Sequence, residues 1–266
     1  MSGAHPPATD RKVYAHLCTW FKTPAWSGRW EMWESSFEPT PHDPDRIRYN
    51  GQRDIAAVDY PLTDVYDSSD PDLIDFQLLS MKRSGFDGVV VDWDGRRLNA
   101  YRHEGMMALL PRLERFGMKL MVCFEEWCGY WPEGHYPDRE AEVEAARAEA
   151  QWLMDTIAGQ GLYAEVRGVK PVLVFRKKPK LNFTAEQWRR IREPLDAAGG
   201  AVVFPPDAED ALDAVGDGRF FWVGGFEPEH RFGSLEGVKG RNAAFLESAP
   251  KRACRTDPPL VLASAV

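Results

Sequence analysis

Six apolar runs rich in β-branched residues recur along this chain, and each ends abruptly in polar or acidic residues. Three of them end in carboxylate pairs: residues 86–94 (FDGVVVDWD), 118–126 (MKLMVCFEE) and 220–229 (FFWVGGFEPE). Continuous apolar runs are typical of parallel strands that are covered on both faces. A buried strand that stops on Asp or Glu carries a charge that water, a partner or a ligand must compensate. The pattern predicts polar groups gathered at the C-terminal edge of a parallel sheet.

Helical segments alternate with these runs. We expect strands at residues 13–20, 86–93, 118–125, 169–175, 201–204 and 220–226, with a further strand-like stretch at 260–266. We expect helices at residues 69–84, 100–116, 138–158, 184–198 and 207–215. Strict alternation gives a doubly wound open sheet or a (β/α)8 barrel. Because no glycine-rich phosphate turn follows the first strand, the α/β fold expected is a TIM-type barrel, incomplete or irregular at its C-terminal end.

The length of 266 residues suits one large domain. We expect a flexible arm at residues 1–11, a single (β/α) barrel domain at 12–246 and a C-terminal tail of uncertain order at 247–266. The irregular segment 21–69 is rich in Trp, Pro, Asp and Arg. A connection of that length inside a compact domain is usually functional.

Charge and composition exclude several classes of partner. Lys+Arg 33 against Asp+Glu 41 gives a net charge of −8, so no nucleic-acid partner is expected. No apolar stretch reaches the length of a membrane span, and the N-terminus has no apolar signal core. Cys18 and Cys123 lie in apolar runs and are interpreted as small hydrophobic residues, and Cys123 and Cys128 are too isolated for a zinc site. Free thiols without a signal sequence indicate a cytoplasmic protein, and we expect neither a metal nor another cofactor.

Aromatic residues suggest what the polar edge binds. The chain has ten Trp, and several of them lie beside polar residues in segments whose composition is typical of loops. A flat ring next to polar groups suits a sugar, whose C–H bonds present an apolar face. Capping of the core is an equally weighted interpretation of the same residues. If the sugar interpretation holds, the candidate stacking residues are Trp20, Trp93, Trp127 and Trp131.

Residues 54–95 carry a resemblance to a known family. The segment reads DIAAVDYPLTDVYDSSDPDLIDFQLLSMKRSGFDGVVVDWDG, and YAHLCTWFKTP with WSGRWEMW precedes it. It resembles the glycoside hydrolase family 99 and 71-like group, which includes the endo-α-mannosidases. The match covers residues 13–135. The resemblance implies a (β/α)8 barrel that acts on α-linked glycans, mannosides in particular, with an oligosaccharide or polysaccharide as partner.

The resemblance also implies a catalytic position. A strand-end motif of the form Glu-Pro-Tyr-Glu-Gly carries two carboxylates in family 99, one as base on the sugar 2-hydroxyl and one as acid/base. The matching stretch here is residues 125–129 (EEWCG). Glu125 falls on the first carboxylate, and Cys128 stands in place of the second. A thiol with a pKa near 8.5 is a poor replacement acid, so the family mechanism does not carry over whole.

Glu125 and Glu126 are neighbours, so a strand that runs through both points their side chains to opposite faces. We expect Glu125 on the inner face; if the strand ends at Glu125, Glu126 also reaches the cleft and replaces the missing acid. The other catalytic candidate is Asp92, which shares its parity with Asp94. Asp94 is either a clamp on sugar hydroxyls or a turn cap. Three further residues are substrate-binding candidates, each weighed against an ordinary structural role: His16, Tyr60 and Glu227.

Two functions from different classes follow. The first is a glycoside hydrolase that uses carboxylate acid/base catalysis at the C-terminal face of the barrel. The second is a non-catalytic carbohydrate-binding barrel, which Cys128 at the acid position favours. A metal-dependent hydrolase built on Asp92, Asp94 and Glu125 is weaker, because histidines are sparse.

Overall fold

The protein is represented by a computed structural model. It describes residues 12–34, 42–57, 59–97, 99–126, 136–176, 182–206, 208–221, 243–252, 254–256 and 258–262.

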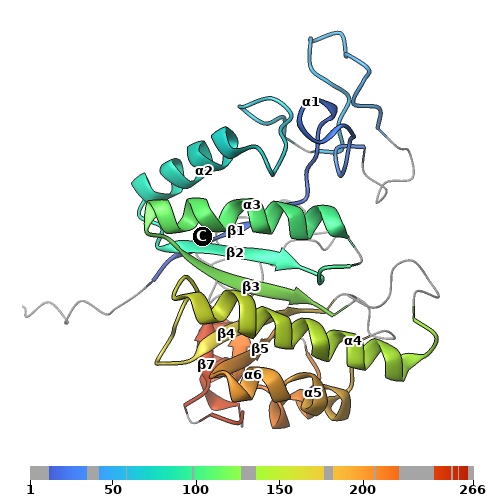
Figure 1. Cartoon of the computed structure of the whole chain (residues 1–266). Helices are drawn as coiled ribbons and strands as arrows, with labels where there is room; N and C mark the ends of the chain where they lie inside the picture. The colour runs from blue at the N-terminus through green and yellow to red at the C-terminus, as the bar shows by residue number, and fades with distance from the viewer. Residues whose placement is uncertain are drawn as a thin grey trace, which may run out of the picture.

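A curled sheet of seven parallel strands forms the centre of the molecule (Figure 1). The strands pair in chain order, so each neighbour in the sequence is also the neighbour in space. They are β1 (Tyr14–Leu17), β2 (Gly88–Trp93), β3 (Lys119–Glu125), β4 (Lys170–Phe175), β5 (Gly200–Phe204), β6 (Gly218–Phe220) and β7 (Leu260–Leu262). The sheet is the expected (β/α) barrel in incomplete form.

Helices connect successive strands. They are α1 (Pro24–Ser27), α2 (Pro71–Arg83), α3 (Ala100–Phe116), α4 (Arg139–Trp152), α5 (Ala185–Ile191) and α6 (Glu193–Ala197). Short 3-10 turns occur at η2 (Ala158–Gln160), η3 (Asp210–Ala214) and η5 (Ala249–Lys251), and η1 (Leu153–Ile157) is a π-helical turn. Sequence-encoded caps set several boundaries: Asp70 caps α2, Asp138 caps α4 and Thr184 forms a capping box with Gln187.

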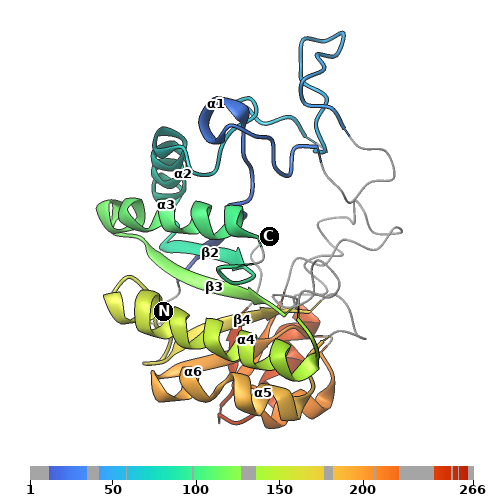
Figure 2. The same ribbon diagram turned by 45° about the vertical axis from the view of Figure 1, so that its right-hand side comes forward.

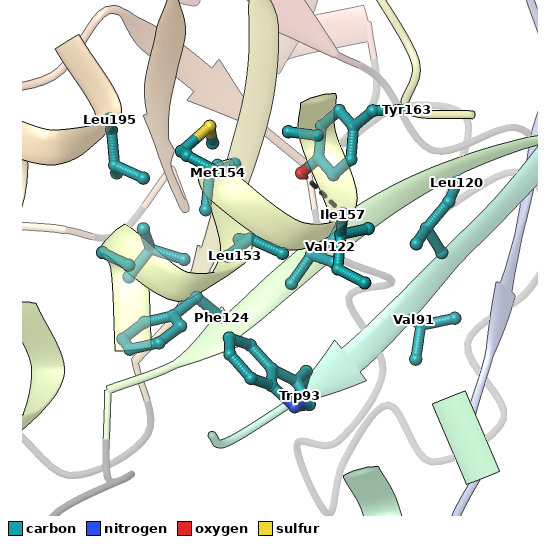
Figure 3. Packing of buried hydrophobic residues seen from close by; sticks show 14 of the residues in the cluster. Val91, Trp93, Leu120, Val122, Phe124, Leu153, Met154, Ile157, Tyr163 and Leu195 are labelled. Carbon is teal, nitrogen blue, oxygen red and sulfur yellow. Dashed lines mark hydrogen bonds between the residues drawn. The ribbon is translucent and has the colours of Figure 1, made fainter. Parts of the chain in front are cut away.

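The two faces of the sheet have different neighbours. On the outer face, residues of β2 and β3 pack against the helices, as Figure 3 shows for Trp93 and Phe124 beside Leu153 and Ile157. The inner face carries a separate apolar cluster made of strand residues and one connecting residue, Ala164. Its members are Val90, Met121, Cys123, Ala164, Leu173, Ala201, Val203, Phe220 and Leu260. Alternation along each strand therefore decides which side chains face the lumen.

Three local expectations differ from the structure. The helix expected at 184–198 is broken at Arg192 into α5 and α6, because Pro194 cannot donate the next helical hydrogen bond. The helix expected at 207–215 is the short 3-10 turn η3. The segment 247–266, expected as a C-terminal tail of uncertain order with a strand-like stretch at 260–266, contributes β7 to the sheet, next to β6.

Candidate active site

Polar residues lie in two layers on the inner face, near the C-terminal ends of β1, β2 and β3. Asp92 of β2 is in register with Cys123 of β3, and both lie on the face of Val90 and Met121. Asp94 follows β2 and Glu125 ends β3, two residues further along each strand. Each layer is thus roughly 6–7 Å from the next. All four residues are buried.

The upper layer is an ion cluster around Arg102. Nη1 of Arg102 lies 3.1 Å from Oε1 of Glu125 and 3.2 Å from Oδ2 of Asp94. The side chain of Asn99 also donates a hydrogen bond to Asp94. One guanidinium therefore holds two carboxyl groups from different strands next to each other.

Arg102 reaches this position from the first turn of α3. Its guanidinium stacks over the ring of Trp20, 4.1 Å from the ring centre, and its carbonyl accepts a hydrogen bond from the hydroxyl of Thr19. Gly105 permits this close approach, because a Cβ at that position would lie 2.2 Å from the carbonyl oxygen of Thr19. Burial acts to lower the pKa of Arg102, but Asp94 and Glu125 outweigh it and raise that pKa, so the guanidinium stays charged.

Asp94 is the carboxyl group in this layer that is biased toward its neutral form. Burial raises its pKa above the ordinary value, and Arg102 and Asn99 offset only part of that effect. A buried carboxyl group with a raised pKa beside another carboxyl group is the arrangement that suits a general acid.

The lower layer is different in composition. Nε2 of His16 lies 2.9 Å from Oδ1 of Asp92, and Sγ of Cys18 lies 3.7 Å from Oδ2 of the same carboxylate. Donor atoms of His16, Asp92 and Cys123 all lie within 4.8 Å of one another, close enough to hold one metal ion. Burial first, and then Asp92, raise the pKa of Cys123 well above its usual value.

Glu126 lies on the opposite face from Glu125. Oε1 of Glu126 accepts hydrogen bonds from Nη1 of Arg176, at 2.6 Å, and from the indole of Trp188 on α5. Burial raises the pKa of Glu126 to about 8, against the opposing effects of Arg176 and Trp188. The possibility that Glu126 replaces the missing acid therefore disagrees with this geometry, because Glu126 follows the end of β3 and bonds to Trp188, which belongs to the core on the helix side of the sheet.

The tryptophans adjoining the strands have different surroundings. Trp93 is fully buried between the sheet and the helices, where it packs against His103, Phe124 and Trp152. Figure 3 shows Trp93 and Phe124 in this core. The expectation that Trp93 stacks on a sugar is wrong. Trp93 alternates with Asp92 and Asp94 along the chain, so its ring lies in the core on the outer face of the sheet and not in the lumen. Trp20 is half-buried beside the upper layer and remains a candidate for sugar contact.

The remaining expected site residues are not among the groups described in the two layers. Tyr60 is half-buried, donates a hydrogen bond to Asp64 and accepts one from the backbone N–H of Arg53 at 3.3 Å. These contacts belong to the segment between β1 and α2. Four candidates lie outside the described residues: Trp127, Cys128, Trp131 and Glu227.

Two arginines that compensate the strand-end carboxyl groups were missed from the sequence, Arg102 on the inner face and Arg176 beside Glu126. Arg102 lies in the first turn of a helix and Arg176 just after β4, and neither position has a local signature. The sequence contains only an indirect indication of these arginines. Buried carboxylates at strand ends require a positively charged partner, and an arginine in a connection that follows a strand can supply it.

A parallel (β/α) barrel with carboxylates at the C-terminal edge of its strands is an architecture common to many enzymes. Among solved structures, the chain is similar to the GH99 endo-alpha-mannosidase from Bacteroides thetaiotaomicron, with a TM-score of 0.67 and 16% identity over 95% of this chain and 70% of that one. A second structure of that enzyme, in complex with bis-tris-propane, gives a TM-score of 0.61, and a glycoside hydrolase-like protein gives 0.56 at 11% identity. No protein-family profile and no curated protein sequence matches the chain.

The chain therefore has a glycoside hydrolase family 99-like fold. At these identities the likeness establishes the fold alone. No helix among the described residues is long and apolar enough to cross a membrane.

Proposed function

We propose that this protein is a glycoside hydrolase that acts on α-linked glycans, mannoside- or glucan-like, at the C-terminal face of the barrel. The observation that carries the proposal is the pairing of Asp94 and Glu125 through one nitrogen of Arg102. Their contacted oxygens are no further apart than the sum of those two distances. The two carboxyl groups are therefore close enough for both to act on one bound sugar, as a two-carboxyl mechanism requires.

The two carboxyl groups have different roles in this proposal. Glu125, whose charge Arg102 compensates, acts on the sugar as the base or assisting carboxylate. Asp94, whose pKa burial raises, donates a proton to the departing glycosidic oxygen. Asp94 thus takes the place that the expected motif assigns to residue 128. Asp92 lies one layer deeper and supports the floor of the site.

The substrate class rests on fold likeness and on aromatic surface. The structures of similar fold include an endo-alpha-mannosidase. Trp20, which lies beside Arg102 at the edge of the upper layer, offers a flat apolar surface of the kind that stacks on a sugar ring.

The test compares Glu125→Gln, Asp94→Asn and Glu126→Gln with the wild-type protein on α-mannoside and α-glucan oligomers. Release of new reducing ends is measured, and thermal unfolding checks that each variant is folded. We expect Glu125→Gln and Asp94→Asn to reduce turnover by at least about 100-fold, as loss of a general acid or base does. Glu126→Gln is the matched control, because its side chain lies on the other face, and it should retain turnover. Full turnover by folded Glu125→Gln would refute the assignment.

A second function is a carbohydrate-binding barrel without catalysis. It is favoured by the same arginine, since an ion pair with Arg102 occupies both carboxyl groups. This alternative predicts that the wild-type protein binds glycans, as measured by calorimetry, yet releases no reducing ends. It also predicts that Trp20→Ala weakens binding while Asp94→Asn leaves it nearly unchanged.

A further inference from the structure

The lower layer on the inner face contains a set of side chains that the glycosidase proposal does not use. It consists of His16, Cys18, Asp92 and Cys123, contributed by three neighbouring strands and their ends. The register of the sheet brings Asp92 and Cys123 side by side. His16 is in register with Val90. Cys18, two residues further along the same strand direction, therefore lies on the same face and level with Asp92. Residues up to 107 positions apart in sequence thus share one layer.

The distances match those of a metal-binding group. Zinc binds imidazole nitrogen, carboxylate oxygen and thiolate sulfur at roughly 2.0–2.3 Å, so ligand atoms around one tetrahedral ion lie roughly 3.3–3.8 Å apart. His16 and Asp92 are 2.9 Å apart, Cys18 and Asp92 are 3.7 Å apart, and the donors of His16, Asp92 and Cys123 all fit within 4.8 Å. Shifts of the donor atoms by a few tenths of an ångström, and by up to about one ångström for the longest separation, would bring them to the spacing of a tetrahedral coordination shell.

A second observation points to a ligand here. Asp92 is 2% exposed, and its Oδ1 has no hydrogen-bond donor among the described residues. The nearest described group to this oxygen is Nε2 of His16, at 2.9 Å, which forms an ion pair with it when the imidazole is protonated. In the upper layer Arg102 compensates two carboxyl groups, whereas in the described part of the chain no arginine or lysine forms an ion pair with Asp92. A buried carboxylate that lies beside an imidazole and thiols, with no arginine or lysine paired to it among the described residues, is the environment that a divalent cation stabilises.

We propose that His16, Asp92 and Cys123 bind one Zn²⁺ ion in the barrel lumen, with Cys18, whose Sγ lies 3.7 Å from Asp92, as the candidate for a fourth ligand. The mixed nitrogen, oxygen and sulfur donors select a borderline-soft cation over Mg²⁺ or Ca²⁺, which prefer oxygen alone. The ion would lie roughly one layer, 6–7 Å, below Asp94 and Glu125. It would compensate the charge of Asp92 and fix β1 to β2 and β3 at the floor of the site.

Local sequence predicts no zinc site here, because Cys18 and Cys123 lie in apolar runs and no pair of ligands has a zinc-finger spacing. A site assembled across strand register has no such spacing. One ligand each from neighbouring parallel strands is sufficient, and the separation in sequence is set by the connecting helices.

The test is Zn²⁺ binding by the full chain after treatment with a chelator and dialysis. Calorimetry measures stoichiometry and affinity, and Co²⁺ in place of Zn²⁺ reports the ligand type through its thiolate charge-transfer absorption and tetrahedral visible bands. We expect one ion per chain, a thiolate-to-cobalt band, and a rise in the unfolding temperature with added Zn²⁺. Absence of stoichiometric binding to the folded wild-type protein overturns the proposal.

Variants identify the ligands. Cys123→Ser and Asp92→Asn should each weaken Zn²⁺ binding at least tenfold, since even residues that only support a ligand have effects of about 10–100-fold. Cys123 is fully buried, so His16→Gln, at an exposed position, provides a variant whose folding is less at risk. The matched control is Cys254→Ser, because Sγ of Cys254 also lies 3.7 Å from an aspartate, Asp213, but Arg219 and Arg252 already pair with that carboxylate. Cys254→Ser should bind Zn²⁺ as the wild-type protein does.

Two results would contradict the assignment. Unchanged affinity in folded His16→Gln and Cys123→Ser would remove both residues from the shell. Equal losses in Cys254→Ser and Cys123→Ser would show that the ion binds thiols without regard to the lumen. Neither readout depends on glycan turnover, so failure of the hydrolase proposal leaves this test intact.

Discussion

The buried acidic side chains at the ends of β2 and β3 are compensated in three different ways. Glu125 and Asp94 share Arg102, Glu126 has Arg176 and the indole of Trp188, and Asp92 faces His16 and thiols. The cost of removing a carboxylate from water is large, so each arrangement determines which protonation state the folded protein favours.

Loss of Arg102 should affect stability and do so in a pH-dependent manner. Arg102→Met leaves Asp94 and Glu125 buried without their cation, which is expected to cost about 3–5 kcal/mol at pH 7. The cost should fall at pH 5, because the uncompensated carboxyl groups then accept protons more readily. Chemical denaturation at both pH values measures this loss of unfolding free energy. Arg102→Lys, which keeps the positive charge, is the control. An equal loss at the two pH values would indicate that Arg102 acts through packing alone.

Glu126 should make the protein less stable as the pH rises. Its pKa in the folded protein is about 8, above the ordinary value of 4.5, so folding favours the protonated form. That contribution is complete below about pH 4.5 and is lost as the pH rises toward 8. We expect the unfolding free energy of the wild-type protein to decline relative to Glu126→Gln over this window. If the difference in unfolding free energy between the two proteins stayed constant from pH 4.5 to 8, the raised pKa of Glu126 would be disproved.

Among the elements, α3 has the greatest influence on the candidate site. It carries Arg102 and passes so close to the end of β1 that Gly105 contacts Thr19 without room for a side chain. Its C-terminal end is set by Gly117 in the left-handed region. The position of one helix relative to one strand end thus decides whether the guanidinium reaches both carboxyl groups.

A methyl group at Gly105 should displace α3. Gly105→Ala gains about 1 kcal/mol of helix propensity, but its Cβ would meet the carbonyl oxygen of Thr19 at 2.2 Å. Overpacking of that kind costs roughly 1–3 kcal/mol or more, so a net loss of stability is expected. The control is Gly159→Ala, whose Cβ has its nearest neighbour at 3.7 Å and should be nearly neutral. Thermal and denaturant unfolding compare the two, and equal stability would place α3 further from β1 than described.

At the scale of the whole molecule, the sheet is an incomplete barrel with helices on its outer face (Figure 2). The last described strand, β7, continues the parallel order next to β6. Its Leu260 belongs to the inner apolar cluster that also contains Cys123 and Val90. The C-terminal segment is thus part of the same core as the candidate site.

That integration predicts a stability cost far from the site. Leu260→Ala should lower the free energy of unfolding by about 2–5 kcal/mol, because Leu260 is 3% exposed within the inner cluster. Leu246→Ala, at a position that is 49% exposed, should change it by less than about 0.5 kcal/mol. Denaturant unfolding measures both. A negligible effect of Leu260→Ala would mean that β7 contributes little to the fold.

Much of the architecture can be predicted from local sequence. Apolar runs, caps at Asp70 and Thr184, and the alternation with helices determine the parallel strands and their order, because these signals depend on neighbours within a few residues. Alternation also places Asp92 with Asp94, and Glu125 opposite Glu126.

Only the tertiary structure decided which groups meet. Both faces of a covered parallel strand are apolar, so the sequence could not identify the lumen face, and Trp93 proved to lie on the other one. The reach of Arg102 to Glu125, and the meeting of His16 with Asp92 and Cys123, depend on helix docking and strand register. These are long-range contacts whose geometry no local pattern encodes, which is why the fold was predictable and the partners of its carboxylates were not.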